Sequence, residues 1–278
     1  MSCLPFQRAM ETCGLCLQKK PLRESHLLPR SVYSVIRNLY GSNSGIISAS
    51  SIDGNAILTD KHVTSKFLCH ECEQMLNRNG ENAVMKEYKR SPQKFRLLDI
   101  LEHHRHRTIH EGQYWYHASD LIDIDCESYL YFASSVFWKA SSRKWGRMAD
   151  IYHHALGRQY SEQFRQYLMG HSKFPKNACL AVYVNSKRGP QDFAQFPSFE
   201  KREGYHVHSF QIPGIKFVMV VGQKAITHSA IYHDNAIAFV KKPFEYLKEN
   251  NKLVEDFRTG KIVARGKLAK NMIELGAK

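Results

Sequence analysis

The sequence predicts an α+β protein in which an N-terminal metal-stabilised module precedes a central helical segment and a C-terminal antiparallel β-rich part with terminal helices. Two C-x-x-C pairs lie within the first ninety residues, and helical periodicity dominates from about residue 93 to residue 170. After residue 177, short β-rich runs alternate with Gly, Pro and Asn. We therefore expect a module over 1–92 and a body over 93–278, with a sub-boundary near 171–177.

Composition and charge indicate a folded protein with an anionic partner. The chain has 278 residues, 43% of them hydrophobic and 12% aromatic, which is enough to fill a core. The net charge of +14 favours polyanions, and we expect nucleic acid, DNA first, although a basic balance also serves solubility alone. The sequence contains neither an apolar run of the ~18 residues that a membrane span needs nor a signal-peptide core. We expect a cytoplasmic location.

A helix and a hairpin are expected between the two cysteine pairs. After Pro29, the segment "SVYSVIRNLY" keeps apolar residues at i, i+3, i+4 and i+7, which predicts a helix. The segment "GIISASSIDGNAILTD" places an Asp53-Gly54 turn between two strand-forming runs, which predicts a hairpin. Another helix should follow the second cysteine pair.

The body should combine core helices with an antiparallel sheet. The segment "YLYFASSVFWKA" brings its apolar residues to one helix face, and "MADIYHHALGRQYSEQFRQYLMG" predicts a long amphipathic segment that ends at Gly170. The runs "ACLAVYVN", "YHVHSFQI", "IKFVMVV" and "AIAFV" predict the strands. The end of the chain should return to helix, with Pro243 in a first turn and a basic outer face.

The cysteine pairs predict a structural zinc site. Each C-x-x-C turn presents two sulfurs to one ion, so the expected ligands are Cys13, Cys16, Cys69 and Cys72. Four thiolates leave no open position for water, so this zinc should hold structure and perform no chemistry. Chance pairing of the cysteines is the alternative. Three further cysteines stand apart and are expected to be small buried or neutral residues: Cys3, Cys126 and Cys179.

The order of the motifs carries a resemblance to a family. A C-x-x-C pair, then Ser25-His26 with Pro29 three residues on, then "LCHECE" at the head of a helix, resembles the zinc-stabilised HNH branch of the His-Me finger nucleases. In particular, it is similar to divergent bacterial proteins with "SH-x-x-P" and "LC-x-x-CE" signatures. The later "LYFASSVFWKASSRKW" resembles a helical segment of those proteins, so the resemblance covers most of the chain. It implies a treble-clef, ββα-metal module.

The resemblance also implies an activity, namely metal-dependent endonuclease cleavage of DNA. His26 matches the general base that takes a proton from the attacking water, and Glu73 matches the helix position that binds the catalytic Mg²⁺ or Mn²⁺. Glu81, eight residues on, is expected to reach the same helix face. By analogy, the family implies a role in bacterial anti-phage defence, with a second copy of the chain or another defence protein as partner.

Two positions depart from the family pattern. Ser25 stands where the family places an acidic metal ligand, and the stretch "HVTSKFL" offers no match to the asparagine that orients the catalytic histidine. These departures favour an alternative function: a non-catalytic, zinc-stabilised module that binds nucleic acid or protein. In that alternative, His26 only fixes the zinc loop through a hydrogen bond.

Basic residues that flank the tryptophan at position 145, together with one arginine just after His26, are candidate nucleic-acid contacts, and an ordinary solvated helix face is the alternative for the residues around position 145. The predicted phosphate-contacting residues are Arg30, Lys139, Arg143, Lys144 and Arg147. Base stacking is a lesser alternative for Trp115 and Trp145, beside burial in the core.

Two histidine-rich stretches are expected to be structural or solvated. The stretch "LEHHRHRTIHEGQYWYH" is not a zincin motif, because its last two histidines are seven positions apart and H-E-x-x-H requires four. It predicts a solvated basic helix end. His206 and His208 alternate on one strand face, where a structural role is expected before metal chelation.

Overall fold

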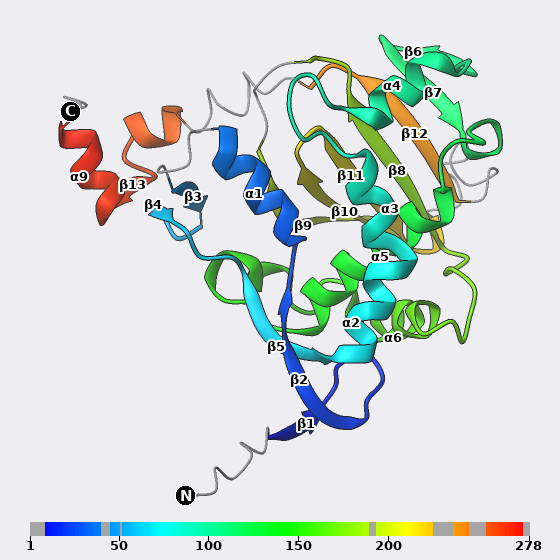
Figure 1. Cartoon of the computed structure of the whole chain (residues 1–278), viewed down its shortest axis with the longest axis horizontal. Coiled ribbons are helices and arrows are strands. Elements are labelled where there is room, and N and C mark those ends of the chain that lie inside the picture. Colours follow the sequence, from blue (N-terminus) through cyan, green and yellow to red (C-terminus); the bar gives the residue numbers. More distant parts are fainter. Residues whose placement is uncertain are drawn as a thin grey trace, which may run out of the picture.

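The computed structural model describes residues 9–39, 45–50, 52–188, 193–224, 236–244 and 254–274. These residues form a mixed α and β fold with three sheets, of which the largest has seven strands. Figure 1 places the seven-stranded sheet at the upper right, the N-terminal ribbon below it, and the last part of the chain on the opposite side.

An antiparallel ribbon followed directly by a helix forms the N-terminal unit. Strands β1, β2 and β5 lie side by side in that order, and the helical column begins at the residue after β5. This confirms the helix expected after the second cysteine pair. The column is interrupted by one π-helical turn. The elements are β1 Met10–Thr12, β2 Lys19–His26, β5 Thr64–Cys69, α2 His70–Leu76, the π turn Asn77–Glu81 and α3 Asn82–Glu87.

The helix and hairpin expected between the cysteine pairs are both present. Helix α1 spans Arg30–Leu39, and strands β3 (Ile46–Ser50) and β4 (Asn55–Thr59) pair antiparallel. Gly54 adopts a positive φ of 59° in the turn between the strands, a conformation that glycine takes without strain.

The end of the chain contains a strand, although the sequence predicts only helix there. Strand β13, Val263–Arg265, pairs in parallel with β4, and helix α9, Lys267–Glu274, follows it. The physical reason is local, because Gly260 and Gly266 both have positive φ and break the helix on either side of β-branched residues. The expected helix after Pro243 falls largely on residues 245–253, outside the described residues.

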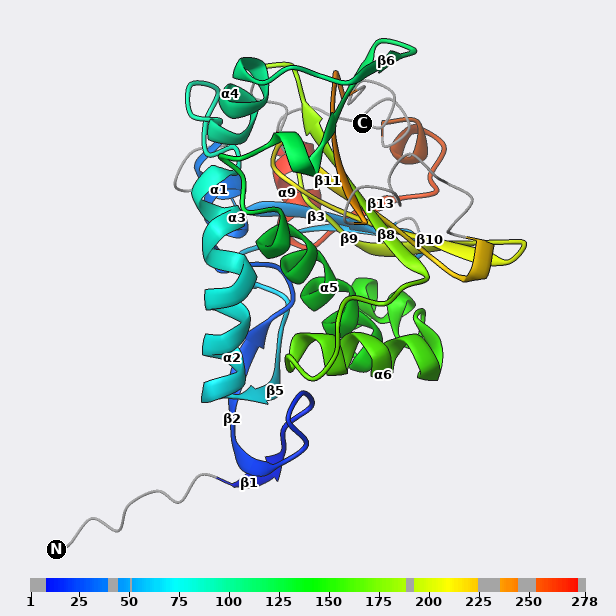
Figure 2. The ribbon, with the colours of Figure 1, turned by 90° about the vertical axis from the view of Figure 1, so that its right-hand side faces the viewer.

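Helix α5, Cys126–Ser142, lies at the centre of the molecule. Its residues 128–141 are all buried, so the expectation of one apolar face is too narrow. The cause is packing on several sides: the π turn lies against α5 so closely that a Cβ on Gly80 would approach the Phe132 backbone nitrogen to 2.8 Å. Figure 2 shows α5 between the column of α2 and α3 and the sheet strands.

The predicted long helical segment before Gly170 is two elements. A 3₁₀ helix at Arg147–Tyr152 and helix α6 at Gly157–Leu168 are separated by a turn, in which His154 adopts a positive φ of 66°. The expected end is confirmed, since Gly170 has a φ of 74° directly after α6.

The large sheet has the strand order β6-β7-β12-β8-β11-β10-β9. Its pairings are antiparallel, as expected, except that β12 and β8 run parallel. Two of its strands, β6 and β7, come from the region expected to be helical, where aromatic residues of "QYWYH" pair with β12 beyond helix α4. The elements are α4 Arg96–His103, β6 Thr108–His110, β7 Gln113–His117, β8 Ala178–Asn185, β9 Gln195–Arg202, β10 Tyr205–Ile212, β11 Ile215–Val221 and β12 Ile237–Lys242.

One continuous hydrophobic cluster joins the two parts of the chain that the sequence separates at residue 92. It includes Leu68 of the ribbon, Tyr129 of α5 and Phe217 of β11. The Tyr129 hydroxyl also donates a hydrogen bond of 3.0 Å to the Glu87 carboxylate. Among the described residues, the structure has no helix with the length and apolar character of a membrane span.

Candidate metal centre and the adjoining histidine site

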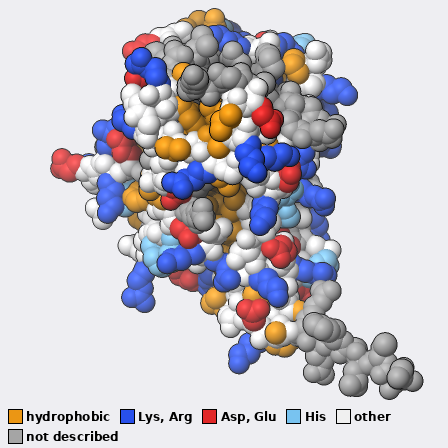
Figure 3. Space-filling view, turned by 90° about the vertical axis from the view of Figure 1, so that its left-hand side faces the viewer, with side chains coloured by type: hydrophobic (Ala, Val, Ile, Leu, Met, Phe, Trp, Pro, Cys, Tyr) orange, Lys and Arg blue, Asp and Glu red, His pale blue; other side chains and the backbone are white. Residues whose placement is uncertain are grey.

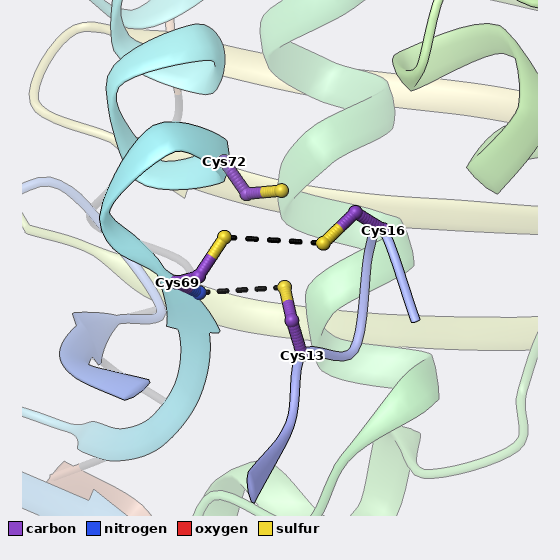
Figure 4. A group of neighbouring side chains, drawn as sticks. All are labelled: Cys13, Cys16, Cys69 and Cys72. Carbon is purple, nitrogen blue, oxygen red and sulfur yellow. Dashed lines mark hydrogen bonds between the residues drawn. The ribbon is translucent and has the colours of Figure 1, made fainter. Parts of the chain in front are cut away.

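Four cysteine sulfurs meet between the first β-turn and the start of α2. Cys13 and Cys16 lie on the turn that joins β1 to β2, Cys69 ends β5, and Cys72 lies in the first turn of α2. Their sulfurs all lie within 4.8 Å of one another, and those of Cys16 and Cys69 are 3.9 Å apart (Figure 4). A tetrahedral zinc with Zn–S bonds of ~2.3 Å separates its sulfurs by about 3.8 Å. The four cysteines can therefore hold a zinc ion.

Close packing fixes the turn that carries Cys13 and Cys16 against the ribbon. Gly14 donates its backbone N–H to the Phe67 carbonyl over 3.0 Å. A Cβ on Gly14 would lie 2.0 Å from the Phe67 ring, so only glycine fits there. From the body, Arg165 of α6 donates to the carbonyl of Leu15 over 2.8 Å. The cluster is thus pre-formed by contacts from both parts of the chain.

The thiols of the cluster differ in pKa. The pKa of the Cys13 thiol falls to about 4, chiefly because the Cys72 thiol donates to it, while burial raises the pKa of Cys69 to about 11. The pKa of Cys72 is raised because its proton is held by Cys13. Binding of a divalent metal would displace these protons, which couples the affinity to pH.

His26 ends β2 at the far end of the ribbon, and its side chain is half-buried. Its Nε2 lies 3.2 Å from Nδ1 of His62. His62 in turn stacks on the ring of Tyr33, with the ring centroids 4.3 Å apart and the planes 14° from parallel. Burial, and then the charges of His62 and Lys139, lower the pKa of His26, which favours the neutral imidazole that a general base requires.

Lys139 is buried in α5 and does not belong to an exposed phosphate-contacting patch, which corrects the sequence prediction for this residue. Its side chain is only 5% exposed, and its Nζ donates to the backbone carbonyl of His26 over 2.8 Å. Burial lowers the pKa of Lys139, while the charges of Glu73 and Glu81 act in the opposite direction. The ammonium is therefore hydrogen-bonded to the His26 backbone and interacts electrostatically with two carboxylates.

The two glutamates come from the column that follows the second cysteine pair. Glu73 lies in α2, and its buried Oε1 has no hydrogen-bond partner within the part of the chain that the structure describes. Glu81 ends the π turn, and burial raises its pKa, with the charge of Glu73 adding to this and that of Lys139 opposing it. An unpartnered carboxylate oxygen beside a second carboxyl group is suited to bind a hard cation.

His26 and the two glutamates do not form a closed set of metal ligands. Within the described ranges, the four cysteines are the one group of three or more His, Cys, Asp or Glu ligand atoms gathered closely enough to hold a metal. Mg²⁺ usually keeps several waters and takes one or two carboxylates. An open site of that kind is compatible with Glu73 and Glu81.

Ser25, at the departure from the family pattern, has a structural role. The residue is 1% exposed, and its Oγ accepts the Leu68 N–H across the ribbon over 3.2 Å. The hydroxyl is therefore engaged in β2–β5 pairing, beside the register shift at Arg23 and Glu24.

The other predicted phosphate contacts differ in accessibility. Arg30 and Lys144 are exposed, whereas Arg143 is half-buried, donates to the Ser65 hydroxyl over 2.7 Å and lies over the Phe67 ring. The side chain of Arg147 lies outside the described residues. Figure 3 shows one face of the molecule, on which Lys and Arg side chains are spread among acidic ones.

The tryptophans are not exposed stacking platforms. Trp145 is 5% exposed, and its indole N–H donates to the Lys139 carbonyl over 2.8 Å. Trp115 is half-buried in β7 and lies edge-on to Tyr183.

Two histidines of the histidine-rich stretches have structural partners. His104 directly follows α4, and its Nε2 lies 3.1 Å from the Asp123 carboxylate. His208 is fully buried in β10 and bonded through Nδ1 to the Tyr152 hydroxyl, and burial lowers its pKa to about 3. Cys126 is half-buried and Cys179 buried, while Cys3 lies outside the described residues.

His62 is the site residue that sequence reasoning missed. The pairing of β2 with β5 would have located it, because His26 lies opposite Thr64 in that antiparallel pair. Residues just before β5 must therefore lie beside the end of β2, and His62 is the histidine at that place.

Comparisons with known protein families, with curated proteins and with solved structures find no match to this chain. The resemblance to HNH nucleases therefore rests on the sequence motifs alone.

Proposed function

We propose that the protein is a metal-dependent endonuclease that hydrolyses phosphodiester bonds of DNA. The observation that supports this most is the convergence around one buried ammonium: Lys139 holds the His26 carbonyl and interacts with the charges of both Glu73 and Glu81. His26, Glu73 and Glu81 all come from the ribbon-and-helix unit whose four cysteines suit structural zinc. The candidate base and the two candidate metal ligands thus share one neighbour.

The chemistry follows from what each residue can do. The neutral imidazole of His26 takes a proton from water, whose oxygen attacks the phosphorus while the bond to the leaving oxygen breaks and that oxygen takes up a proton. Glu73 and Glu81 would hold Mg²⁺ or Mn²⁺, and such an ion stabilises the negative charge that develops on the phosphate. Lys139 fixes the backbone of the base and adds positive charge beside the two carboxylates.

The charge of the chain supports a nucleic-acid substrate. A net charge of +14 attracts a polyanion, and Arg30, beside His26 in sequence, is exposed where α1 begins. DNA as the substrate, the role in anti-phage defence, the cytoplasmic location and a partner protein or second copy come from the resemblance and remain proposals.

A second candidate function is a non-catalytic, zinc-stabilised module that binds nucleic acid or protein. Two observations favour it. The buried hydroxyl of Ser25 serves the ribbon where the family has a metal ligand, and the Lys139 ammonium already offsets part of the charge of the two glutamates.

Ion binding at Glu73 distinguishes the two functions. Mn²⁺ titrated calorimetrically into zinc-loaded protein should bind the wild type and bind Glu73→Gln more weakly. Glu71→Gln is the matched control, because Glu71 lies on the same helix but is exposed and pairs with Lys20. DNA cleavage by the wild type should require the same ion. Equal Mn²⁺ binding by all three proteins, with no ion-dependent cleavage, would overturn the nuclease proposal in favour of the binding module.

A further inference from the structure

The His26–His62 contact constrains the protons of both rings. A neutral imidazole has one N–H and one nitrogen lone pair, so a hydrogen bond between two such rings requires complementary tautomers. The contact joins Nε2 of His26 to Nδ1 of His62 over 3.2 Å, and the ring planes are tilted by 58°. One of these two nitrogens therefore carries the hydrogen and the other accepts it.

His62 is held in place by its own surroundings. Its ring stacks on Tyr33, whose hydroxyl accepts the N–H of the next residue, Val63, over 3.3 Å. The carbonyl of Val63 accepts the N–H of Leu27, the residue after His26, over 3.1 Å. Leu27 and Val63, the residues that follow the two histidines, are thus hydrogen-bonded directly to each other, which fixes the distance between the rings.

Positive charges surround the pair. Arg30 and Arg37 act on His62, and Lys139 and Arg30 act on His26, while Glu24 opposes them at His26. These cations disfavour additional protons on the two rings. One ring nitrogen of the contact therefore keeps its lone pair and can accept the hydrogen of the other. Near neutral pH, the hydrogen bond between two neutral rings is the favoured state.

We propose that His62 is the positioning residue for His26: its Nδ1 accepts the Nε2–H of His26 and so leaves Nδ1 of His26 unprotonated to act as the base. This inference rests on the proposed nuclease function. When Nδ1 of His26 takes a proton from water, the Nε2–H of the resulting imidazolium still donates to His62, which stabilises the new charge. His62 thereby supplies the orienting acceptor that the family pattern assigns to an asparagine.

The tautomer can be measured without any activity. In ¹⁵N-labelled protein, the ring signals of His26 are assigned by their loss in His26→Gln. We expect the wild type to show a protonated Nε2 and an unprotonated Nδ1 on His26, with a scalar coupling through the hydrogen bond to Nδ1 of His62. His62→Ala should remove the coupling, whereas His110→Ala, at an exposed position on β6, should leave it unchanged. A protonated Nδ1 on His26, or no coupling in folded wild type, would overturn the inference.

Kinetic measurements distinguish a failure of this inference from a failure of the nuclease proposal. His62→Ala should lower kcat by about 10–100-fold with little change in KM, and His62→Asn should recover part of the loss because its amide oxygen can accept the same hydrogen bond. Unchanged kcat in His62→Ala, with zinc content and circular dichroism as fold controls, would overturn the positioning role. If the wild type shows the coupling but cleaves no DNA, the nuclease proposal and the catalytic role fall together, and only the tautomer assignment stands.

Discussion

The ammonium of Lys139 on α5 donates a hydrogen bond of 2.8 Å to the backbone carbonyl of His26 at the end of β2. This bond links the central helix to the tip of the N-terminal ribbon across 113 residues of sequence. A buried ammonium needs counter-charges, and Glu73 and Glu81 provide them. The stability of the fold and the arrangement of the candidate site therefore depend on the same group.

Replacement of Lys139 by methionine should destabilise the protein by about 3–5 kcal/mol, because it leaves two partly buried carboxylates without their cation. Urea unfolding measures the change. Lys144→Met, at an exposed position just beyond the end of α5, is the matched control and should change the unfolding free energy by less than about 0.5 kcal/mol. Similar stability of the two variants would show that the buried charge cluster is unimportant.

The same variant should depend on pH in a definite direction. Burial already raises the pKa of Glu81 in the folded protein, and loss of the Lys139 charge would raise it further. A carboxyl group with a raised folded pKa contributes stability below its unfolded pKa, and that contribution is lost as pH rises through the folded pKa. Lys139→Met should therefore recover part of its lost stability when the pH is lowered from 7 to about 5, measured by urea midpoints. If the difference in unfolding free energy between the wild type and Lys139→Met grew on acidification, this prediction would be wrong.

Substitution of Cys69 by serine should remove bound zinc and unfold the ribbon, because metal binding and folding are coupled at a site of this kind. Zinc content by atomic emission and far-UV circular dichroism measure the two effects. Cys126→Ser is the control, since Cys126 is half-buried and lies outside the cluster. A Cys69→Ser protein that keeps its fold and stoichiometric zinc would eliminate the four-cysteine site.

Alanine at position 80 should destabilise the fold although alanine favours helices. Its Cβ would lie 2.8 Å from the Phe132 backbone nitrogen, and backbone cannot yield as a side chain can. We expect a loss of about 1–3 kcal/mol from overpacking, against a gain of at most ~1 kcal/mol in helix propensity. Asn82→Ala, at an exposed position two residues on, is the control and should be neutral or stabilising. Thermal unfolding distinguishes the cases; a more stable Gly80→Ala would show that α5 and the π turn pack less closely.

DNA cleavage should respond to pH through His26. Because burial and neighbouring cations lower its pKa, the acidic limb of the kcat/KM profile should have its midpoint below the ordinary histidine value of ~6.5. Activity should thus fall only on acidification below that range and should be level through neutral pH. A midpoint above 6.5 would show that a group other than His26 limits the reaction.

The sequence predicted the metal cluster and the elements around it because those signals are local. Cysteine spacing identified Cys13, Cys16, Cys69 and Cys72, and turn and periodicity patterns located α1 and the β3–β4 hairpin.

Long-range relationships could not be predicted in the same way. Strand β13 depends on pairing with β4, some 200 residues earlier in the sequence. Strands β12 and β8 pair in parallel although the antiparallel strands β9, β10 and β11 lie between them in the sequence. Lys139 resembled a surface lysine because nothing in its neighbourhood of sequence shows that α5 is covered on every side.

The central claim is that His26 is the general base of a metal-dependent nuclease, and plasmid cleavage tests it most directly. Wild type and His26→Ala are incubated with supercoiled plasmid and with single-stranded DNA in Mg²⁺, Mn²⁺ or EDTA, and DNA affinity is measured in parallel by gel shift. We expect ion-dependent nicking by the wild type that is lost in His26→Ala while the affinity is kept. Salt-dependent binding by both proteins without cleavage by either would contradict the claim and identify a binding module.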